Sequence, residues 1–294
     1  MGSELRQITA AAAHILPLGA RGAVESVGGK AGGFAILAAA GLDFPGGFVL
    51  SAEAHRHARG LGWSTGMPIP AATSAAVSDA LATVPGEAFV VRSSAVAEDG
   101  ASASFAGQFE TIVGVTREDV AAAIAECWGS AGNGRALAYR SAERDEHTMA
   151  VIVQPLVDAD ASGVVVTVDP ITGDEQTLLV NASFGLGEAV VSGLVTPDEY
   201  RIARADACVI AATIGAKELE IVRGSDGALE ERALPVERST APTLDAEELR
   251  ALWQGALAAE AILGRPADLE FAFAAGRLLW LQCRPLTALP TKED

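Results

Sequence analysis

The sequence predicts a fold of the α+β class, and its length and two kinds of segment indicate this. At 294 residues the chain is long enough for two domains or for one large α/β unit. Short runs of β-favouring residues, such as Met149–Pro155, are typical of buried strands. Longer segments, of which Asp245–Leu263 is the clearest, have the apolar period of an amphipathic helix. We therefore expect sheets covered by helices.

Composition and charge exclude several classes of protein. Half of the residues are apolar but only 5% are aromatic, which predicts a core of Val, Leu, Ile and closely packed Ala. The formal net charge of −17 argues against a nucleic-acid binder and means that any anionic ligand must be met by a few well-placed cations. The three cysteines, which lack CxxC spacing, are expected to be buried apolar residues in a reducing cytoplasm. We find no apolar run long enough to span a membrane and no convincing signal peptide, so a cytoplasmic location is expected.

A glycine-rich segment near the N-terminus precedes a predicted helix. Gly28 and Gly29 are expected to form a loop, Lys30 follows, and residues Ala31–Ala40 are expected to form a helix that Gly41 closes. A lysine in the first turn of a helix can contact phosphate, because the helix dipole and the unsatisfied N–H groups favour anions there. The spacing is not that of a P-loop. A solvated surface position is the alternative for Lys30.

The most informative run reads FVVRSSAVAEDGASASFAGQFET and spans residues 89–111. It begins as a strand, and Arg92 with the hydroxyl pair Ser93-Ser94 follows where the strand is expected to end. A guanidinium, hydroxyls and glycines such as Gly107 can together hold phosphate. The alternative is a surface loop in which Arg92 pairs with the acidic pair Glu98-Asp99.

The remaining segments predict alternating strands and helices. The further strands that we expect are Phe48–Leu50, Ile112–Val115, Met149–Pro155, Gly163–Asp169, Leu178–Asn181, Cys208–Ile214 and Lys217–Val222. The further helices are one that Ser51 caps, then Ala75–Ala82, Arg117–Trp128, Arg135–Arg144 and Asp245–Leu263, the last capped by Thr243 or Asp245. His55 and His57 stand two apart in the first of these helices, a spacing that does not bring them together, and both are expected at the surface.

Two further features leave their function open. Gln154 is the one polar residue in the run MAVIVQP, where its amide could satisfy a backbone edge or read an adenine, whose edge presents a donor and an acceptor. A second glycine loop, with Gly185 and Gly187 before Glu188, is expected between a strand and a short helix. By itself this loop is weak evidence of a binding site.

The C-terminal segment ADLEFAFAAGRLLWLQCRPLT predicts a β-hairpin that turns at Ala275-Gly276. Alternation places Glu270 on its first strand, and Gln282 and Arg284 on one face of its second. Such groups are costly on apolar strands unless partners or a metal compensate. Two interpretations stay open: a structural Glu–Arg ion pair, or a carboxylate and an amide oxygen that hold Mg²⁺ on the phosphates of a nucleotide.

Six segments, taken in order, resemble the N-terminal ATP-binding domain shared by phosphoenolpyruvate synthase, pyruvate phosphate dikinase and rifampin phosphotransferase. They read VGGKAGGFAIL, VVRSSAVAEDGASASFAGQFET, ECWGSAGNGRALAYR, MAVIVQPLVDADASGVVVTVDPITGD, SFGLGEAVVSGLVTPDEY and DLEFAFAAGRLLWLQCRPLT. Each is weak alone, but the ordered set is specific and covers most of the chain. The resemblance implies an ATP-grasp-like fold in which two subdomains, residues 1–155 and 156–294, clamp ATP in a cleft between them.

The resemblance also implies ATP and Mg²⁺ as cofactors and assigns the residues that bind them. The resemblance implies that Lys30, Arg92 and Arg284 contact the phosphates and that the two arginines are catalytic. It implies that Gly107 and Thr111 cover the phosphates and that Gln154 lies near the adenine. Glu270 and Gln282 are the implied Mg²⁺ ligands.

The function that the resemblance implies is that of the ATP-binding component of a dikinase-type phosphotransferase. Such a component cleaves ATP to AMP and phosphate and passes a phosphoryl group to a histidine on a swivelling domain. None of the four histidines here stands in the Thr-Ser-His-rich context of that motif. The accepting histidine and the acceptor-substrate domain are therefore expected on a separate protein, with no nucleic-acid or membrane partner. The segment GSAGNG after Trp128 also departs from the bulkier apolar residues of the relatives.

Two other functions stay open. The first is a stand-alone ATP-grasp kinase or ligase that acts directly on a small molecule, for which ADP and a modified acceptor would be the products. The second is a non-catalytic nucleotide-binding regulatory subunit, which would bind ATP without turnover.

Overall fold

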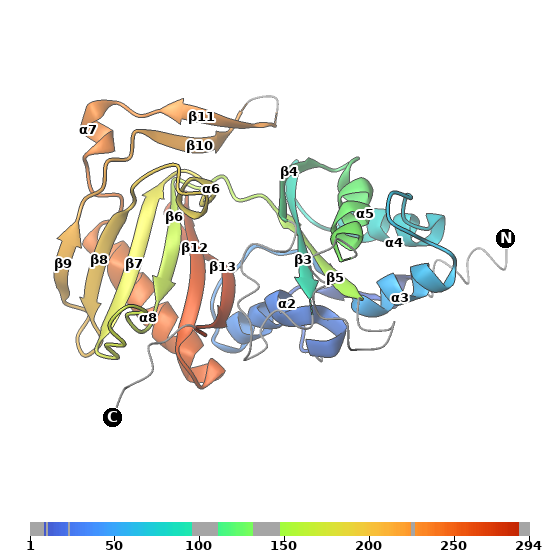
Figure 1. Cartoon of the computed structure of the whole chain (residues 1–294), viewed down its shortest axis with the longest axis horizontal. Coiled ribbons are helices and arrows are strands. Elements are labelled where there is room, and N and C mark those ends of the chain that lie inside the picture. Colours follow the sequence, from blue (N-terminus) through green and yellow to red (C-terminus); the bar gives the residue numbers. More distant parts are fainter. Residues whose placement is uncertain are drawn as a thin grey trace. The chain divides into compact units, whose positions relative to one another are not determined.

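The computed structural model describes residues 9, 11–22, 24–95, 111–131, 148–224 and 227–287 (Figure 1). The chain divides into two compact units, which we call unit 1 (Met1–Ala35 and Gly46–Leu156) and unit 2 (Ile36–Pro45 and Val157–Asp294). Each unit combines an antiparallel sheet with helices, which confirms the predicted α+β class. The assignment of residues 1–155 and 156–294 as functional subdomains stays a prediction.

Unit 1 is built on a five-stranded antiparallel sheet with the strand order β1-β2-β5-β3-β4. Its strands are β1 (Ile15–Pro17), β2 (Phe48–Leu50), β3 (Ala88–Ala95), β4 (Thr111–Thr116) and β5 (Met149–Pro155). Its helices are α2 (Val24–Ala39), whose last residues belong to unit 2, α3 (Ala52–Gly60), α4 (Ala71–Leu81) and α5 (Val120–Ser130).

Alternation along β3 and β5 gives the sheet of unit 1 one apolar face. Phe89 and Val91 of β3 and Val151 and Val153 of β5 are buried in one core cluster with residues of α3, α4 and α5. Because side chains alternate along a strand, the residues between them point to the opposite face. That face carries Arg92.

Two local predictions in unit 1 need correction. The strand that begins at Phe89 does not end at Arg92, because Arg92, Ser93 and Ser94 continue to pair with β5 as far as Ala95. The segment around Gly28 is a kink within α2 and not a loop before it. The predicted helix Arg135–Arg144 lies outside the described residues.

Unit 2 contains a six-stranded antiparallel sheet, ordered β13-β12-β6-β7-β8-β9, and a separate β10-β11 hairpin (Figure 1). The strands are β6 (Ala161–Val166), β7 (Thr177–Phe184), β8 (Asp198–Ala203), β9 (Val209–Thr213), β10 (Leu219–Arg223), β11 (Leu229–Ala233), β12 (Ala267–Ala274) and β13 (Arg277–Pro285). The helices are α6 (Glu188–Val191), α7 (Val236–Ser239) and α8 (Ala246–Leu263). The predicted C-terminal hairpin is confirmed as β12 and β13.

Helix α8 covers one face of the six-stranded sheet (Figure 1). Asp245 caps it through a capping box with Glu248, which decides between the two predicted caps. Gly255 sits where α8 meets β13, and a side chain there would collide with the indole of Trp280. Among the described residues no helix is both long enough and apolar enough to cross a membrane.

The cysteine prediction holds for two of three positions. Cys127 and Cys283 are buried, whereas Cys208 is exposed. The surface prediction for His55 is wrong, because this side chain is only 2% exposed. Its ring stacks on Trp128, with 4.9 Å between centroids and 8° between planes, and meets the edge of Trp63.

A buried ion pair joins β8 to the segment that leads into β10. The side chains of Lys217 and Asp198 are both 0% exposed and form a salt bridge. Asp198 also accepts from the backbone N–H groups of Gly215 (2.9 Å) and Thr243 (2.7 Å) and from the Tyr200 hydroxyl (3.0 Å). Burial alone would raise the pKa of Asp198, but Lys217, Thr243 and Gly215 lower it. Lys217 is the cation that compensates the buried charge of this carboxylate.

We predict that Lys217→Met lowers the free energy of unfolding by about 3–5 kcal/mol, because it leaves a buried carboxylate without its cation. Urea denaturation measures the loss. Arg277→Met is the matched control, since the side chains of Arg277 and of its partner Asp43 are 70% and 72% exposed and this change should alter stability by less than about 1 kcal/mol. Equal effects of the two changes would contradict the prediction.

The His55 imidazole predicts a second effect on stability. Its Nδ1 accepts a hydrogen bond from the Met149 N–H (3.2 Å), so the folded protein requires an unprotonated Nδ1. Burial lowers the pKa of His55 from 6.5 to about 4, and the charge of Arg59 acts in the same direction. The stabilisation is thus complete above pH 6.5 and is lost as the pH falls toward 4.

Between pH 6.5 and 4, we expect His55 to account for a loss of about 3 kcal/mol in the free energy of unfolding. Denaturant unfolding followed by tryptophan fluorescence measures this loss. His55→Leu should flatten the pH dependence in this window, and His57→Gln should leave it in place. An unchanged slope in His55→Leu would show that other groups cause it.

Candidate functional site

The face of the unit 1 sheet opposite the core gathers three of the predicted site residues. Arg92 of β3 lies directly opposite Thr111 of β4 and Ile152 of β5. Gln154 of β5 lies opposite Val90, two residues before Arg92. Because directly opposed residues and residues two apart share a face, Arg92, Thr111 and Gln154 project to the same side.

Lys30 comes from α2 and reaches β3 next to Arg92. Its Nζ donates to the carbonyl oxygen of Ser93 at 3.3 Å. Lys30 and Arg92 are both half-buried, so Lys30 is not the fully solvated surface residue of its alternative interpretation, whereas the alternative pairing of Arg92 with Glu98 or Asp99 stays open. Gly107, Glu98 and Asp99 lie outside the described residues, and their predicted roles stay predictions.

Gln154 carries an unsatisfied polar atom. The side chain is 3% exposed, and its Oε1 has no hydrogen-bond partner within the part of the chain that the structure describes. The backbone-edge explanation is not supported at Oε1, because this atom accepts from no backbone N–H of the described residues. A buried carbonyl oxygen without a partner costs about 1–3 kcal/mol, which a ligand donor would recover.

In unit 2, the β12-β13 hairpin places the other predicted residues on one face. Glu270 lies directly opposite Gln282, and Asp268 lies directly opposite Arg284. Since Asp268 and Glu270 are two apart on the same strand, all four side chains share that face. The predicted common face of Gln282 and Arg284 is confirmed.

Asp268 is a functional candidate that the sequence analysis missed. Arg284 Nη2 forms an ion pair with its carboxylate at 2.8 Å, and Arg284 Nε donates to it at 3.0 Å. Burial raises the pKa of Asp268, the charge of Arg284 opposes this, and the charge of Glu270 adds to the rise. The available signal in the sequence was its position two residues before Glu270, because residues two apart on a strand share a face.

The oxygen donors on this face fit Mg²⁺. Asp268 and Glu270 offer carboxylates and Gln282 offers an amide oxygen, the hard ligands that Mg²⁺ prefers. Within the described ranges there is no group of three or more His, Cys, Asp or Glu residues that could hold a metal. These protein donors therefore suit an ion that takes its remaining ligands from a phosphate and water.

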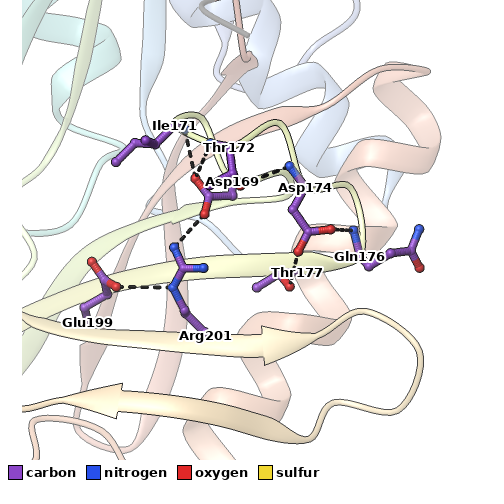
Figure 2. A network of polar contacts seen from close by, with 8 residues as sticks. All are labelled: Asp169, Ile171, Thr172, Asp174, Gln176, Thr177, Glu199 and Arg201. Carbon is purple, nitrogen blue, oxygen red and sulfur yellow. Dashed lines mark hydrogen bonds and ion pairs between the residues drawn. The ribbon is translucent and has the colours of Figure 1, made fainter. Parts of the chain in front are cut away.

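The same face continues into a polar network at the loop between β6 and β7 (Figure 2). Arg201 of β8 reaches Asp169 Oδ2 at 2.5 Å and Glu199 Oε1 at 3.4 Å. Asp169 Oδ1 also accepts from the N–H groups of Ile171 (2.8 Å) and Thr172 (3.2 Å). Burial would raise the pKa of Asp169, but these donors and Arg201 lower it to about 2. The network fixes the shape of the loop.

The second glycine loop has a structural role. Gly185 has a positive φ of 74°, and a side chain there would collide with the carbonyl oxygen of Ile221. The next residue, Leu186, donates its N–H to that oxygen at 2.8 Å. This close approach of the loop to β10 explains the glycine without a ligand.

Comparison with known proteins decides the family. Residues 63–294 match the family described as pyruvate phosphate dikinase, AMP/ATP-binding domain. The chain belongs to this family. This match confirms the family resemblance that the six motifs indicate. The matched range contains every predicted site residue except Lys30.

Curated relatives are much longer than this member of the dikinase ATP-binding family. The prodigiosin synthesizing transferase PigC of Serratia marcescens is 35% identical over 279 residues, which are 89% of this chain and 31% of PigC. A rifampicin phosphotransferase of a Streptomyces species is 39% identical over 236 residues, 77% of this chain and 27% of that protein. The chain spans less than a third of either relative.

Solved structures similar to the dikinase-family chain include two ligases. The VanG D-Ala:D-Ser ligase of Enterococcus faecalis has a TM-score of 0.42 at 11% identity, covering 90% of this chain and 54% of that one. The ATP-grasp ligase PsnB in complex with a minimal precursor has a TM-score of 0.31 at 15% identity, covering 90% and 53%.

We predict that Asp169→Asn destabilises the protein by about 1–2 kcal/mol at pH 7, because it removes a charge-assisted bond while keeping the size of the side chain. The lowered pKa means that the carboxylate stabilises above pH 3.8 and that this effect is lost as the pH falls toward 2. Urea denaturation at pH 7 and pH 3 should therefore show a smaller difference from wild type at pH 3. The exposed Asp79→Asn is the control and should change little.

Proposed function

We propose that the chain binds Mg·ATP and is the ATP-binding component of a dikinase-type phosphotransferase. In this proposal ATP is cleaved to AMP and phosphate, and a phosphoryl group passes to a histidine on a separate protein that also carries the acceptor-substrate domain. Membership of the AMP/ATP-binding family supports the nucleotide. The short share of its relatives that the chain spans supports the need for further domains.

One observation carries the proposal: the buried, unsatisfied Oε1 of Gln154 on the same sheet face as Arg92. An amide oxygen can accept from the exocyclic amino group of adenine, and a guanidinium can hold phosphate oxygens. The two groups suit opposite ends of one nucleotide. Buried acceptors in proteins are almost always hydrogen-bonded, so an unpaired one favours a ligand-binding role for this face over a purely structural one.

The cations have a clear electrostatic task. With a net charge of −17, the protein as a whole repels a triphosphate, so local positive groups must overcome this. Lys30 and Arg92 of unit 1 and Arg284 of unit 2 are the cations we assign to the phosphates. Arg92 and Arg284 are the proposed catalytic residues, because phosphoryl transfer depends on positioning and on neutralising charge.

Mg²⁺ would be held by Glu270 and Gln282, with Asp268 as a third donor beside Arg284. When bound, the ion neutralises charge on the phosphates and helps to orient them. The chain's own contribution is to hold two carboxylates close together on one rigid hairpin. A divalent cation would relieve their mutual repulsion.

Calorimetry of Mg·ATP binding tests the proposal. Arg92→Ala, Gln154→Ala and Glu270→Ala should each weaken binding, the two charge changes by about 10- to 100-fold, as loss of a charge-assisted contact predicts. Glu270→Ala should matter far less when ATP is offered without Mg²⁺, because its role is to hold the ion. Unchanged binding in all three variants would exclude the site.

Matched controls separate a binding defect from a general loss of charge. Arg56→Ala removes a half-exposed arginine of unit 1, and Glu230→Ala removes a half-exposed glutamate of unit 2. Both should bind Mg·ATP like wild type. Adding proteins that carry a candidate histidine domain and analysing the products then tests the chemistry: AMP supports the dikinase reaction, and ADP with a phosphorylated small molecule contradicts it.

A further inference from the structure

Helix α2 contains a backbone break two residues before Lys30. Gly28 has φ 77° and ψ 170°, which are not helical values, although the residues on both sides are helical. The break makes Gly29 and Lys30 the start of the main helical part of α2. The first N–H groups of a helix have no partner within the helix and need an acceptor from elsewhere.

Ser94 supplies such an acceptor from β3. The Ala31 N–H donates to Ser94 Oγ at 3.1 Å, and Ser94 and Ala31 are buried, at 0% and 3% exposure. Ser94 stands 63 positions further along the chain, so this is a helix cap provided by a different element. Serine is among the preferred capping residues because its oxygen accepts these N–H bonds well.

The cap depends on close contact between α2 and β3. A Cβ atom at Gly28 would lie 2.5 Å from Ser94 Oγ and would also overlap the Ser94 carbonyl group. The positive φ of Gly28 is itself unfavourable for other residues. Gly28 therefore allows the approach, and the Ser94 hydroxyl holds it.

This contact fixes Lys30 beside Arg92. Lys30 immediately precedes the capped Ala31, and its Nζ reaches the carbonyl oxygen of Ser93, the neighbour of Ser94. Arg92 is two residues before Ser94 and shares its face of the sheet. One hydroxyl thus sets the position of the helical turn that carries Lys30 relative to the strand that carries Arg92.

We propose that Ser94 is a positioning residue for Lys30: its hydroxyl caps the broken helix and thereby places the Lys30 amine for the phosphates of ATP. The inference rests on the proposed function, in which Lys30 contacts those phosphates. It differs from the sequence-based expectation that the Ser93-Ser94 hydroxyls themselves serve the phosphate, because the Ser94 side chain is fully buried and accepts from the α2 backbone.

A double-mutant cycle on Mg·ATP binding tests the role. Lys30→Ala should weaken binding by about 10- to 100-fold and Ser94→Ala by about 3- to 10-fold. If Ser94 acts through Lys30, then Ser94→Ala has no further effect in the Lys30→Ala background. With Glu270→Ala, which lies on a strand of unit 2, the Ser94→Ala effect should add in full.

The matched control is Ser93→Ala. It removes the same hydroxyl from an equally buried neighbour whose side chain points to the opposite face, and it keeps the carbonyl oxygen that Lys30 contacts. Binding within about twofold of wild type is expected. Wild-type affinity in Ser94→Ala, or an equal loss with and without Lys30, would overturn the inference.

A measurement without nucleotide separates the inference from the proposed function. Hydrogen exchange of the peptide around Val27–Phe34 should be faster in Ser94→Ala than in wild type and Ser93→Ala, because the Ala31 N–H loses its acceptor. Unchanged exchange would overturn the cap. If exchange changes but neither Lys30→Ala nor Arg92→Ala affects Mg·ATP binding, the cap stands, the proposed function fails, and the positioning role falls with it.

Discussion

The antiparallel pairing of β3 with β5 is the constraint on which unit 1 depends. It buries Phe89 and Val91 against the helical layer and sends Arg92, Ser94 and Gln154 to the other face. A shift of the pairing by one residue would exchange the two sets, placing a guanidinium in the core and large apolar groups on the opposite, polar face. The energy of the apolar core therefore also specifies where the polar groups stand.

Alternation alone could predict much of the polar face of the β12-β13 hairpin. The C-terminal hairpin has a period of two, so the sequence indicates that Gln282 and Arg284 share a face, and the register shows Glu270 on that face. The same rule applied to Asp268 would have added it. What alternation could not give is the cross-strand partner, because the pairing of Asp268 with Arg284 depends on the turn and on a bulge after Glu270.

Features that depend on contacts with distant parts of the chain could not be predicted from the sequence. The polar residues at the end of β3 predict a loop from Arg92 onward, but pairing with β5 overrides this local preference. His55 looks like a surface residue, yet it is enclosed by Trp63 and by Trp128, which lies 73 positions away. Ser94 looks like a phosphate ligand until its contact with α2 is known. In each case another part of the chain provides the environment of the residue, so the local sequence does not predict it.

The buried pair of Lys217 and Asp198 has a consequence for how sequences of this family can change. Removing one charge leaves the other unpaired in the interior. Replacing both residues with apolar residues of similar volume can leave the stability of the fold unchanged or even increase it. Replacing the two residues one at a time therefore passes through a strongly destabilised protein with one unpaired buried charge. The two positions should thus change together or both stay unchanged across related sequences. An exposed pair such as Arg277 with Asp43 has no such barrier, so each of its members can change independently.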